Sequence, residues 1–186
     1  MAAARVWAVL NLLAQAIQSS ARLQGLPPQI ASHTRMLVLG SFPGVTSLAR
    51  QQYYAHPHNA FWKILQAVWP SSPYSEIADS YQNRIDWMLD KGLGLWDVYA
   101  SCQRVGSLDS AIEQPQRNDL AQLIGRTPGL QLIAHNGGES FKHARYTRTL
   151  GLPVYRLPST SPANASWTFE RKLAAWREVV ALAGLL

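Results

Sequence analysis

Hydrophobic and polar residues along this chain follow two alternating patterns. Short apolar runs bounded by glycine or proline are typical of buried strands, and they occupy residues 35–40, 93–98, 130–134 and 154–157. Apolar residues three or four positions apart are typical of amphipathic helices, and they occupy residues 61–68, 81–89, 120–124 and 169–180. Strands that alternate with helices favour a parallel sheet covered on both faces. We therefore expect the α/β class, with three α/β/α layers around a central four-stranded parallel sheet.

The start of the chain carries a further helical pattern. Its apolar positions fall on one helix face: Val9, Leu12, Leu13 and Ile17. Polar residues interrupt the apolar stretch that a signal peptide would need: Asn11, Gln15 and Gln18. We expect residues 1–24 to form a helical extension packed on a single domain that spans residues 1–186. The sequence has no apolar run long enough to cross a membrane.

Composition narrows the choice of partners and cofactors. Lys and Arg number 17 against 11 Asp and Glu, which gives a net charge of +6, and small basic domains often bind nucleic acid. This charge does not separate a DNA-binding protein from any other basic enzyme. The only cysteine, Cys102, excludes an internal disulfide, a cysteine-rich zinc site and a four-cysteine iron–sulfur cluster. It fits a reducing, cytoplasmic setting.

In a parallel sheet, ligands bind beyond the carboxyl ends of the strands. This rule predicts that four loops meet in one site: residues 40–59, 97–107, 135–138 and 158–166. The first loop begins with Gly40, Ser41, Phe42, Pro43 and Gly44. Two glycines around a proline let the backbone approach a ligand closely, and its N–H groups suit an anion or the edge of a base. The loop lacks the lysine of a phosphate-binding P-loop.

The rest of the first loop concentrates polar and aromatic side chains just before the helix expected at residues 61–68. These side chains include Tyr54, His56, His58 and Asn59. Because so many polar groups are costly in a buried loop, we interpret this segment as functional. Asn59 alternatively caps the helix N-terminus. No third ligand accompanies His56 and His58 at a telling spacing, so we expect no metal.

The last of these loops is rich in small hydroxyl residues. It contains Ser159, Thr160, Ser161, Pro162, Ala163 and Asn164, between a strand and a helix. Hydroxyls and exposed backbone N–H groups suit contacts with a phosphate backbone. The same residues are alternatively the ordinary capped start of the following helix. The sequence has no Gly-x-Ser-x-Gly elbow, which argues against an esterase nucleophile.

Taken together, these segments resemble the hypoxanthine-DNA glycosylase family of the uracil-DNA glycosylase superfamily. The motifs occur in that family's order, over roughly residues 25–180. They are Gly-Ser-Phe-Pro-Gly from Gly40, Gln-Tyr-Tyr-Ala-His-Pro-x-Asn-x-Phe-Trp from Gln52, Leu-Trp-Asp-Val from Leu95, Gly-Ser-Leu-Asp-Ser from Gly106, His-Asn-Gly-Gly from His135, and Ser-Thr-Ser-Pro-Ala-Asn from Ser159. Two features depart from the family. His58 stands where arginine is common, and residues 1–24 precede the usual start.

The resemblance implies a monofunctional DNA glycosylase that acts in DNA repair. Such an enzyme flips a deaminated base, here hypoxanthine before others, out of DNA and hydrolyses its glycosidic bond with water. The resemblance assigns the catalytic role to Asn59, which would hold the water, and His56 would assist. It implies no cofactor, and it implies a monomer whose partner is damaged DNA.

The resemblance also implies how the base and the DNA are held. Phe42 would stack on the flipped base, and main-chain N–H groups of Ser41 and Phe42 would bind its polar edge together with the Asn136 side chain. Asp97 would read an N–H of the base. The pocket is completed by Gly40, Pro43, Gly44 and Tyr54. The loop from Ser159 to Asn164 would grip phosphate and enter the base stack, although Ala163 is a small wedge.

Three other functions stay open from the sequence. The first is a uracil or mismatched-thymine glycosylase, although those branches have Asp or Asn where Phe42 stands here. The second is a module that binds damaged bases without catalysis, in which Asn59 would serve recognition alone. The third is a nucleotide-binding α/β enzyme unrelated to DNA, and the missing phosphate-binding fingerprint argues against it.

Overall fold

The computed structural model describes residues 22–71 and 80–186. Its centre is a sheet of four parallel strands, β2 (Met36–Gly40), β3 (Leu93–Asp97), β6 (Leu132–Asn136) and β7 (Val154–Leu157), in the order β3-β2-β6-β7. Gly40 pairs with Asp97, and Asn136 pairs with Leu157. All four strands therefore end at the same edge, and the expected four-stranded parallel sheet is confirmed.

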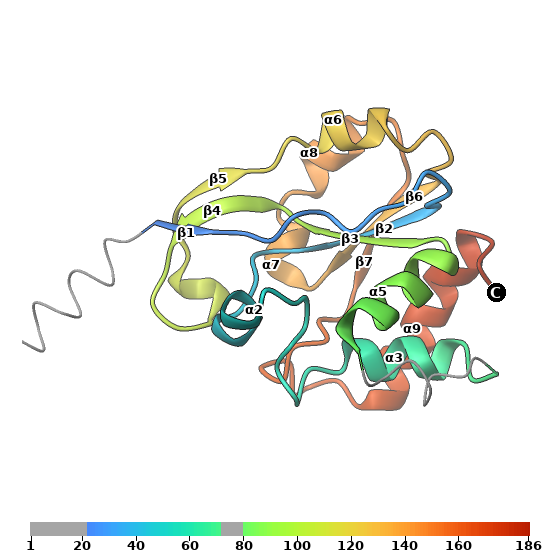
Figure 1. The fold of residues 1–186 in the computed structure, drawn as a ribbon, viewed down its shortest axis with the longest axis horizontal. Coiled ribbons are helices and arrows are strands. Elements are labelled where there is room, and N and C mark those ends of the chain that lie inside the picture. Colours follow the sequence, from blue (N-terminus) through green and yellow to red (C-terminus); the bar gives the residue numbers. More distant parts are fainter. Residues whose placement is uncertain (1–21, 72–79) are drawn as a thin grey trace, which may run out of the picture.

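Helices cover both faces of this sheet (Figure 1). One face is covered by α3 (Phe61–Val68), α5 (Tyr81–Asp90) and α9 (Phe169–Leu182). The other face is covered by α6 (Leu120–Gly125), α7 (Gly138–Phe141) and α8 (Ala144–Arg148). The three-layer arrangement expected from the sequence is therefore present.

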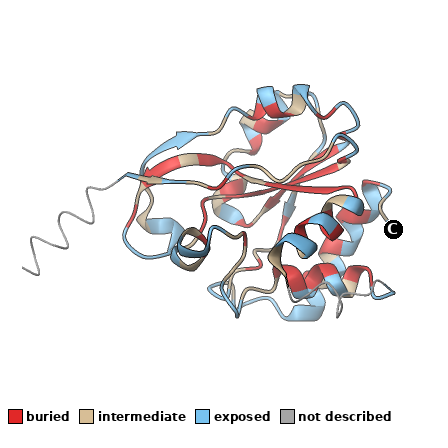
Figure 2. Cartoon of the chain, viewed as in Figure 1, coloured by how far each residue is buried: buried red, intermediate tan, exposed pale blue. Residues whose placement is uncertain are grey.

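The central strands are buried on both faces (Figure 2). Because successive side chains of a strand point to opposite faces, Met36 and Val38 join the core beneath α3, α5 and α9. Leu37 and Leu39 join the core beneath α6 and α8. Burial on both faces explains why the sequence shows short apolar runs here and not an alternation of apolar and polar residues.

A second, antiparallel sheet lies beside the first and was not predicted. It consists of β1 (Arg22–Gln24), β4 (Tyr99–Gln103) and β5 (Glu113–Arg117), in the order β1-β4-β5. The prediction of a helix through residues 22–24 is therefore wrong, and part of the loop expected at 97–107 is a strand. Every residue of β5 is exposed, so the apolar alternation that marks a half-buried strand is absent. The helix predicted for residues 1–21 lies outside the described residues.

Local signals set the ends of the predicted helices. Ser80 caps α5 by accepting a hydrogen bond from Asn83 N. Gly92, just after the end of α5, has a left-handed backbone at φ 77°.

The strand expected at residues 130–134 begins two residues later than predicted. Leu130 N donates to Thr127 O in a turn, and β6 begins only at Leu132. The short elements α2 (Val45–Arg50) and η1 (Asp109–Ala111) were not predicted. In the described part of the chain, no helix has the length and apolar character needed to cross a membrane.

Candidate active site

The loops that follow the parallel strands do meet at one edge of the sheet. Val98 N donates to Gly40 O over 2.9 Å, which joins the loops after β3 and β2. Ala60 N donates to Thr160 O over 2.9 Å, which joins the polar segment before α3 to the loop after β7. The sheet rule therefore assembles the expected candidate site from segments far apart in the sequence.

Asn136 holds three of these segments together. Its Nδ2 donates to the Tyr54 hydroxyl over 3.0 Å and to Thr160 Oγ1 over 2.9 Å. Its Oδ1 accepts from Thr160 N over 3.0 Å. Both Nδ2 protons are therefore used, while Oδ1 keeps one lone pair that can accept from an N–H of a base; the predicted contact between Asn136 and a base stays a prediction.

Asn59 shapes the turn that leads into α3. Its Oδ1 accepts from Phe61 N over 3.0 Å, and the helix itself has Ala60 at its N-cap without a side-chain cap. Asn59 is therefore not the N-cap of α3, as the capping alternative had it; its side chain closes the turn immediately before the helix. A carbonyl oxygen has two lone pairs, so this bond leaves Oδ1 able to accept from a water as well. The catalytic role of Asn59 remains a prediction.

The residues before Asn59 differ in exposure: Tyr54 is half-buried, and the two histidines are exposed. Tyr54 has a left-handed backbone at φ 53° and stacks on Phe61 with ring centroids 4.0 Å apart. His56 and His58 are both exposed, and His56 Nδ1 accepts from His58 N over 3.2 Å. The described residues hold no group of three or more His, Cys, Asp or Glu side chains able to bind a metal ion.

Asp97 is a buried acid at the carboxyl end of β3. Its side chain is 4% exposed, and Oδ2 has no hydrogen-bond partner among the described residues. Burial raises the pKa of Asp97 to about 7, although a hydrogen bond with the Tyr53 side chain acts in the opposite direction. A Cβ on Gly40 would lie 2.3 Å from Asp97 Oδ1. Only glycine therefore fits at position 40 beside this carboxyl group.

Hydrogen bonds join the segment after β4 to the loop from Gly40 to Gly44. Arg104, which is buried, donates to Pro43 O and lies with its guanidinium carbon 5.1 Å from the centroid of the Phe42 ring. Two further hydrogen bonds join these segments. Ser107 Oγ accepts from Val45 N over 2.9 Å, and Ser41 Oγ donates to Asp109 Oδ1 over 2.7 Å. Ser107 and Asp109 belong to a segment that resembles the family, but no sequence signal pointed to Arg104.

Phe42 is buried in this arrangement. Its ring is 6% exposed, lies in the core beneath α6 and α8, and has the guanidinium of Arg104 over it. The main-chain N–H groups of Ser41 and Phe42 form no hydrogen bond with the described residues. The loop thus offers two backbone donors to a ligand, while stacking of Phe42 on a base stays a prediction.

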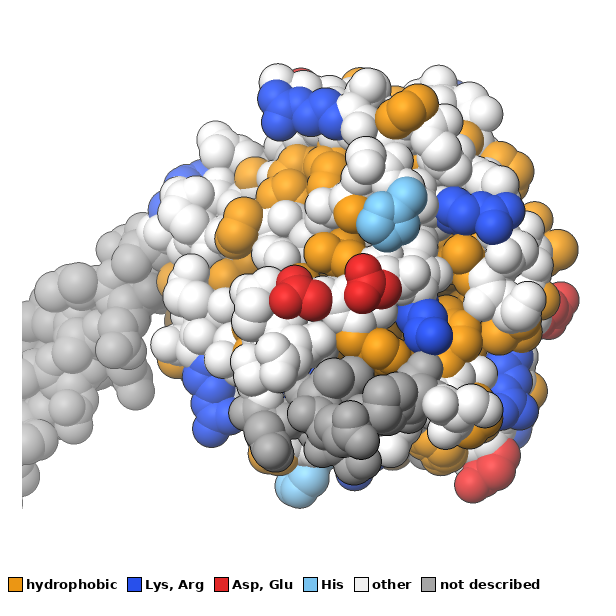
Figure 3. Space-filling model, turned by 45° about the vertical axis from the view of Figure 1, so that its right-hand side comes forward, with side chains coloured by type: hydrophobic (Ala, Val, Ile, Leu, Met, Phe, Trp, Pro, Cys, Tyr) orange, Lys and Arg blue, Asp and Glu red, His pale blue; other side chains and the backbone are white. Residues whose placement is uncertain are grey.

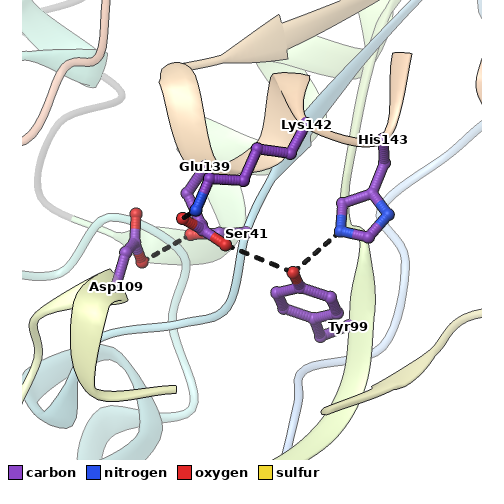
Figure 4. A network of polar contacts seen from close by, with 6 residues as sticks. All are labelled: Ser41, Tyr99, Asp109, Glu139, Lys142 and His143. Atoms are coloured by element: carbon purple, nitrogen blue, oxygen red, sulfur yellow. Dashed lines mark hydrogen bonds and ion pairs between the residues drawn. The ribbon is translucent and has the colours of Figure 1, made fainter. Parts of the chain in front are cut away.

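A polar network that the sequence did not predict borders the first loop (Figure 4). The Tyr99 hydroxyl lies 2.7 Å from His143 Nε2 and 3.3 Å from Glu139 Oε1, and its single proton serves one of them at a time. Lys142 Nζ contacts Glu139 Oε2 over 2.5 Å. Burial lowers the pKa of His143, which favours the neutral ring. The network ties α7, the helix that follows Asn136, to β4.

Hydrogen bonds within the loop after β7 fix its shape. Ser161 N donates to Ser159 Oγ over 3.2 Å, and Ala163 N donates to Ser161 Oγ over 3.3 Å. Both hydroxyls therefore build the turn, whereas Pro162 and Ala163 are exposed at its tip. Each hydroxyl acts as an acceptor in these bonds and keeps its O–H proton for another partner, so the predicted grip on phosphate stays a prediction.

The Lys and Arg side chains do not form one continuous basic patch on the face shown in Figure 3. They are scattered there among Asp, Glu and hydrophobic side chains. Large exposed hydrophobic side chains instead occur near the loops of the candidate site, and they include Val45, Val105, Leu108, Trp167 and Phe169.

Comparison with known proteins identifies the family. The model of the uracil DNA glycosylase superfamily matches residues 27–180. A hypoxanthine DNA glycosylase of Methanosarcina barkeri is 36% identical over 155 residues, which are 83% of this chain and 96% of that protein. A hypoxanthine DNA glycosylase of Methanosarcina acetivorans is 32% identical over 157 residues, 84% of this chain and 96% of that protein.

A solved structure agrees with this result. The solution NMR structure of a candidate uracil DNA glycosylase of Methanosarcina acetivorans has a TM-score of 0.76 and 30% identity, and covers 88% of this chain and 99% of that one. The fold is thus that of a DNA glycosylase. The chain belongs to the uracil DNA glycosylase superfamily, as its motifs predicted.

Proposed function

We propose that this DNA glycosylase removes hypoxanthine from DNA. One observation carries the proposal: the free N–H groups of Ser41 and Phe42 follow Gly40, which lies against Oδ1 of the Asp97 carboxyl group, while the other oxygen of that group, Oδ2, has no hydrogen-bond partner among the described residues. Donors beside an acceptor match the C=O and N–H of a lactam. Deamination of adenine creates that lactam edge in hypoxanthine, so the site is complementary to the deaminated base. The likeness to two hypoxanthine DNA glycosylases supports the choice of this base over uracil.

The proposed mechanism uses water as the nucleophile. Flipping brings the base to the sheet edge, at a cost of a few kcal/mol that is smaller where pairing is weak. As the glycosidic bond breaks, negative charge grows on the base and positive charge on the sugar. The N–H groups of Ser41 and Phe42 stabilise the departing base, while Asn59 positions the water through Oδ1. An amide does not titrate, so Asn59 orients the water and does not remove its proton.

The substrate choice is tested with matched duplexes that hold one hypoxanthine, uracil or xanthine at the same position. We expect the highest single-turnover rate for hypoxanthine, measured by alkaline cleavage of the abasic product. Faster release of uracil would place the chain in another branch of the superfamily. Tight binding of the lesions without release of any base would favour the non-catalytic module.

The exposed tip of the loop after β7 yields a second prediction. Ala163 is exposed and small, so it fills the gap left by a flipped base poorly, and the enzyme depends on lesions that pair weakly. We expect Ala163→Leu to raise the ratio of the single-turnover rate on duplex DNA to that on single strands, most of all for the best-paired lesion. An unchanged ratio would mean that the loop does not enter the base stack, and the role of Asn59 would be unaffected.

A further inference from the structure

A cavity of about 380 Å³ lies beside the candidate site, next to the loop after β7. Its wall includes Ser159, and a Cβ on Gly137 would lie 3.0 Å from Ser159 Cβ. Gly137 directly follows Asn136, so the cavity and the candidate site share a boundary. Its volume falls in the range of ~300–1,000 Å³ that is usual for small ligands.

The wall of this cavity combines an aromatic ring with a positive charge. Trp167 lines it and is 37% exposed, and the guanidinium carbon of Arg171 lies 4.7 Å from the Trp167 ring centroid. Arg156 also lines it and is exposed. Aromatic rings that stack on bases and cations that meet phosphates are the two elements of single-strand binding sites. The wall therefore suits a nucleotide.

The cavity is preformed because its loop is anchored from within. Lys172 Nζ donates to Asn164 O over 3.0 Å, and Asn164 Nδ2 donates to Ser159 O over 3.0 Å. Ser166 Oγ donates to Asn164 Oδ1 over 3.1 Å. A ligand that enters here does not have to order the loop first, which lowers the cost of binding.

We propose that this cavity binds the nucleotide that neighbours the lesion in the same DNA strand. Its base stacks on Trp167 and its phosphate contacts Arg156. The inference rests on the proposed function, because a strand whose lesion lies at the sheet edge continues across Ser159 into the cavity. The subsite grips the strand that carries the lesion and needs no complementary strand.

The test uses single-stranded oligonucleotides whose lesion nucleotide carries a 2′-fluorine, so that it resists cleavage. In one series the lesion is the 5′-terminal nucleotide, or has one or two nucleotides added beyond it on the 5′ side. A second series does the same on the 3′ side, and affinity is measured by fluorescence anisotropy. We expect the first nucleotide added on one side of the lesion to raise affinity roughly five- to a hundredfold, as base–aromatic stacking does. This gain in affinity is the step that the variants test. Trp167→Ala should remove this step, and Trp167→Phe should restore much of it.

Two matched variants serve as controls. Phe169 is exposed to the same 37% but does not line the cavity, so Phe169→Ala should keep the step. Arg156→Gln should weaken binding and reduce the slope of log affinity against log salt by about 0.7, the value for one phosphate on a single strand. Arg145→Gln, at an exposed arginine outside the cavity wall, should leave that slope unchanged.

The outcomes separate this subsite from the proposed function. If the enzyme releases hypoxanthine from a long oligonucleotide but shows no step, or a step that survives Trp167→Ala, the subsite is refuted and the proposed function stands. If no hypoxanthine is released, the proposed function is refuted. Circular dichroism of each variant confirms that a lost step does not reflect a lost fold.

Discussion

Asn59→Ala should lower the single-turnover rate of base release by roughly a hundredfold or more, because a water held in the wrong place costs about that much. Phe42 stands at the position where, by the resemblance, other branches have an acid or amide, so the segment from Gly40 to Gly44 has no carboxylate or amide side chain to hold the water in place of Asn59. The variant should still bind DNA that contains the lesion, since binding rests on other loops. Rates at saturating enzyme, together with binding to an uncleavable lesion, measure the two effects separately.

The hydrogen bond from Phe61 N to Asn59 Oδ1 makes a structural control necessary. Loss of one hydrogen bond of this kind costs about 1 kcal/mol of stability, so Asn59→Ala should unfold at slightly lower denaturant concentration. Asn59→Asp keeps an acceptor for Phe61 N and an oxygen for the water, and it should retain more activity than the alanine variant. A folded Asn59→Ala enzyme with the wild-type rate would leave Asn59 a purely structural role.

The central sheet and the place of the site could be predicted because each rests on a short-range signal. Continuous apolar runs mark strands buried on both faces, and β2, β3 and β6 are buried in this way, whereas the edge strand β7 is only partly buried and contains the exposed Arg156. The rule that ligands bind beyond the strand ends then gathered Gly40, Asp97 and Asn136 without any knowledge of distances. Gly40 is the clearest case, since its glycine is required by the nearby Asp97 carboxyl group.

The remaining parts of the site depend on contacts that leave no pattern in the sequence. Strand β5 is wholly exposed, and pairing with β4 alone defines it. Arg104 reaches Pro43 across 61 positions of the chain, and Tyr99 reaches His143 across 44. The three hydrogen bonds of Asn136 with Tyr54 and Thr160 likewise could not be predicted from the sequence. Such contacts arise only once the fold brings distant segments together.

Asp97→Asn should change stability and activity in opposite directions. The pKa of Asp97 is raised from 3.8 to about 7 by burial. Between these values the unfolded chain has lost the proton while the folded chain keeps it, so the free energy of unfolding falls as pH rises. The stability is therefore fully present below pH ~4 and is lost by pH 7. Asparagine is never charged, so the free energy of unfolding of the variant does not fall with pH for this reason.

At pH 8 the variant should be more stable than the wild type by a few kcal/mol, since each pKa unit corresponds to about 1.4 kcal/mol. At pH 4 the two should unfold at similar denaturant concentrations. If Asp97 reads an N–H of the base, the stabilised variant should nevertheless release hypoxanthine more slowly, because one of its amide positions presents a donor in place of an acceptor. Gained stability with unchanged activity would show that Asp97 does not contact the base, and its buried, unpartnered oxygen would then need another ligand.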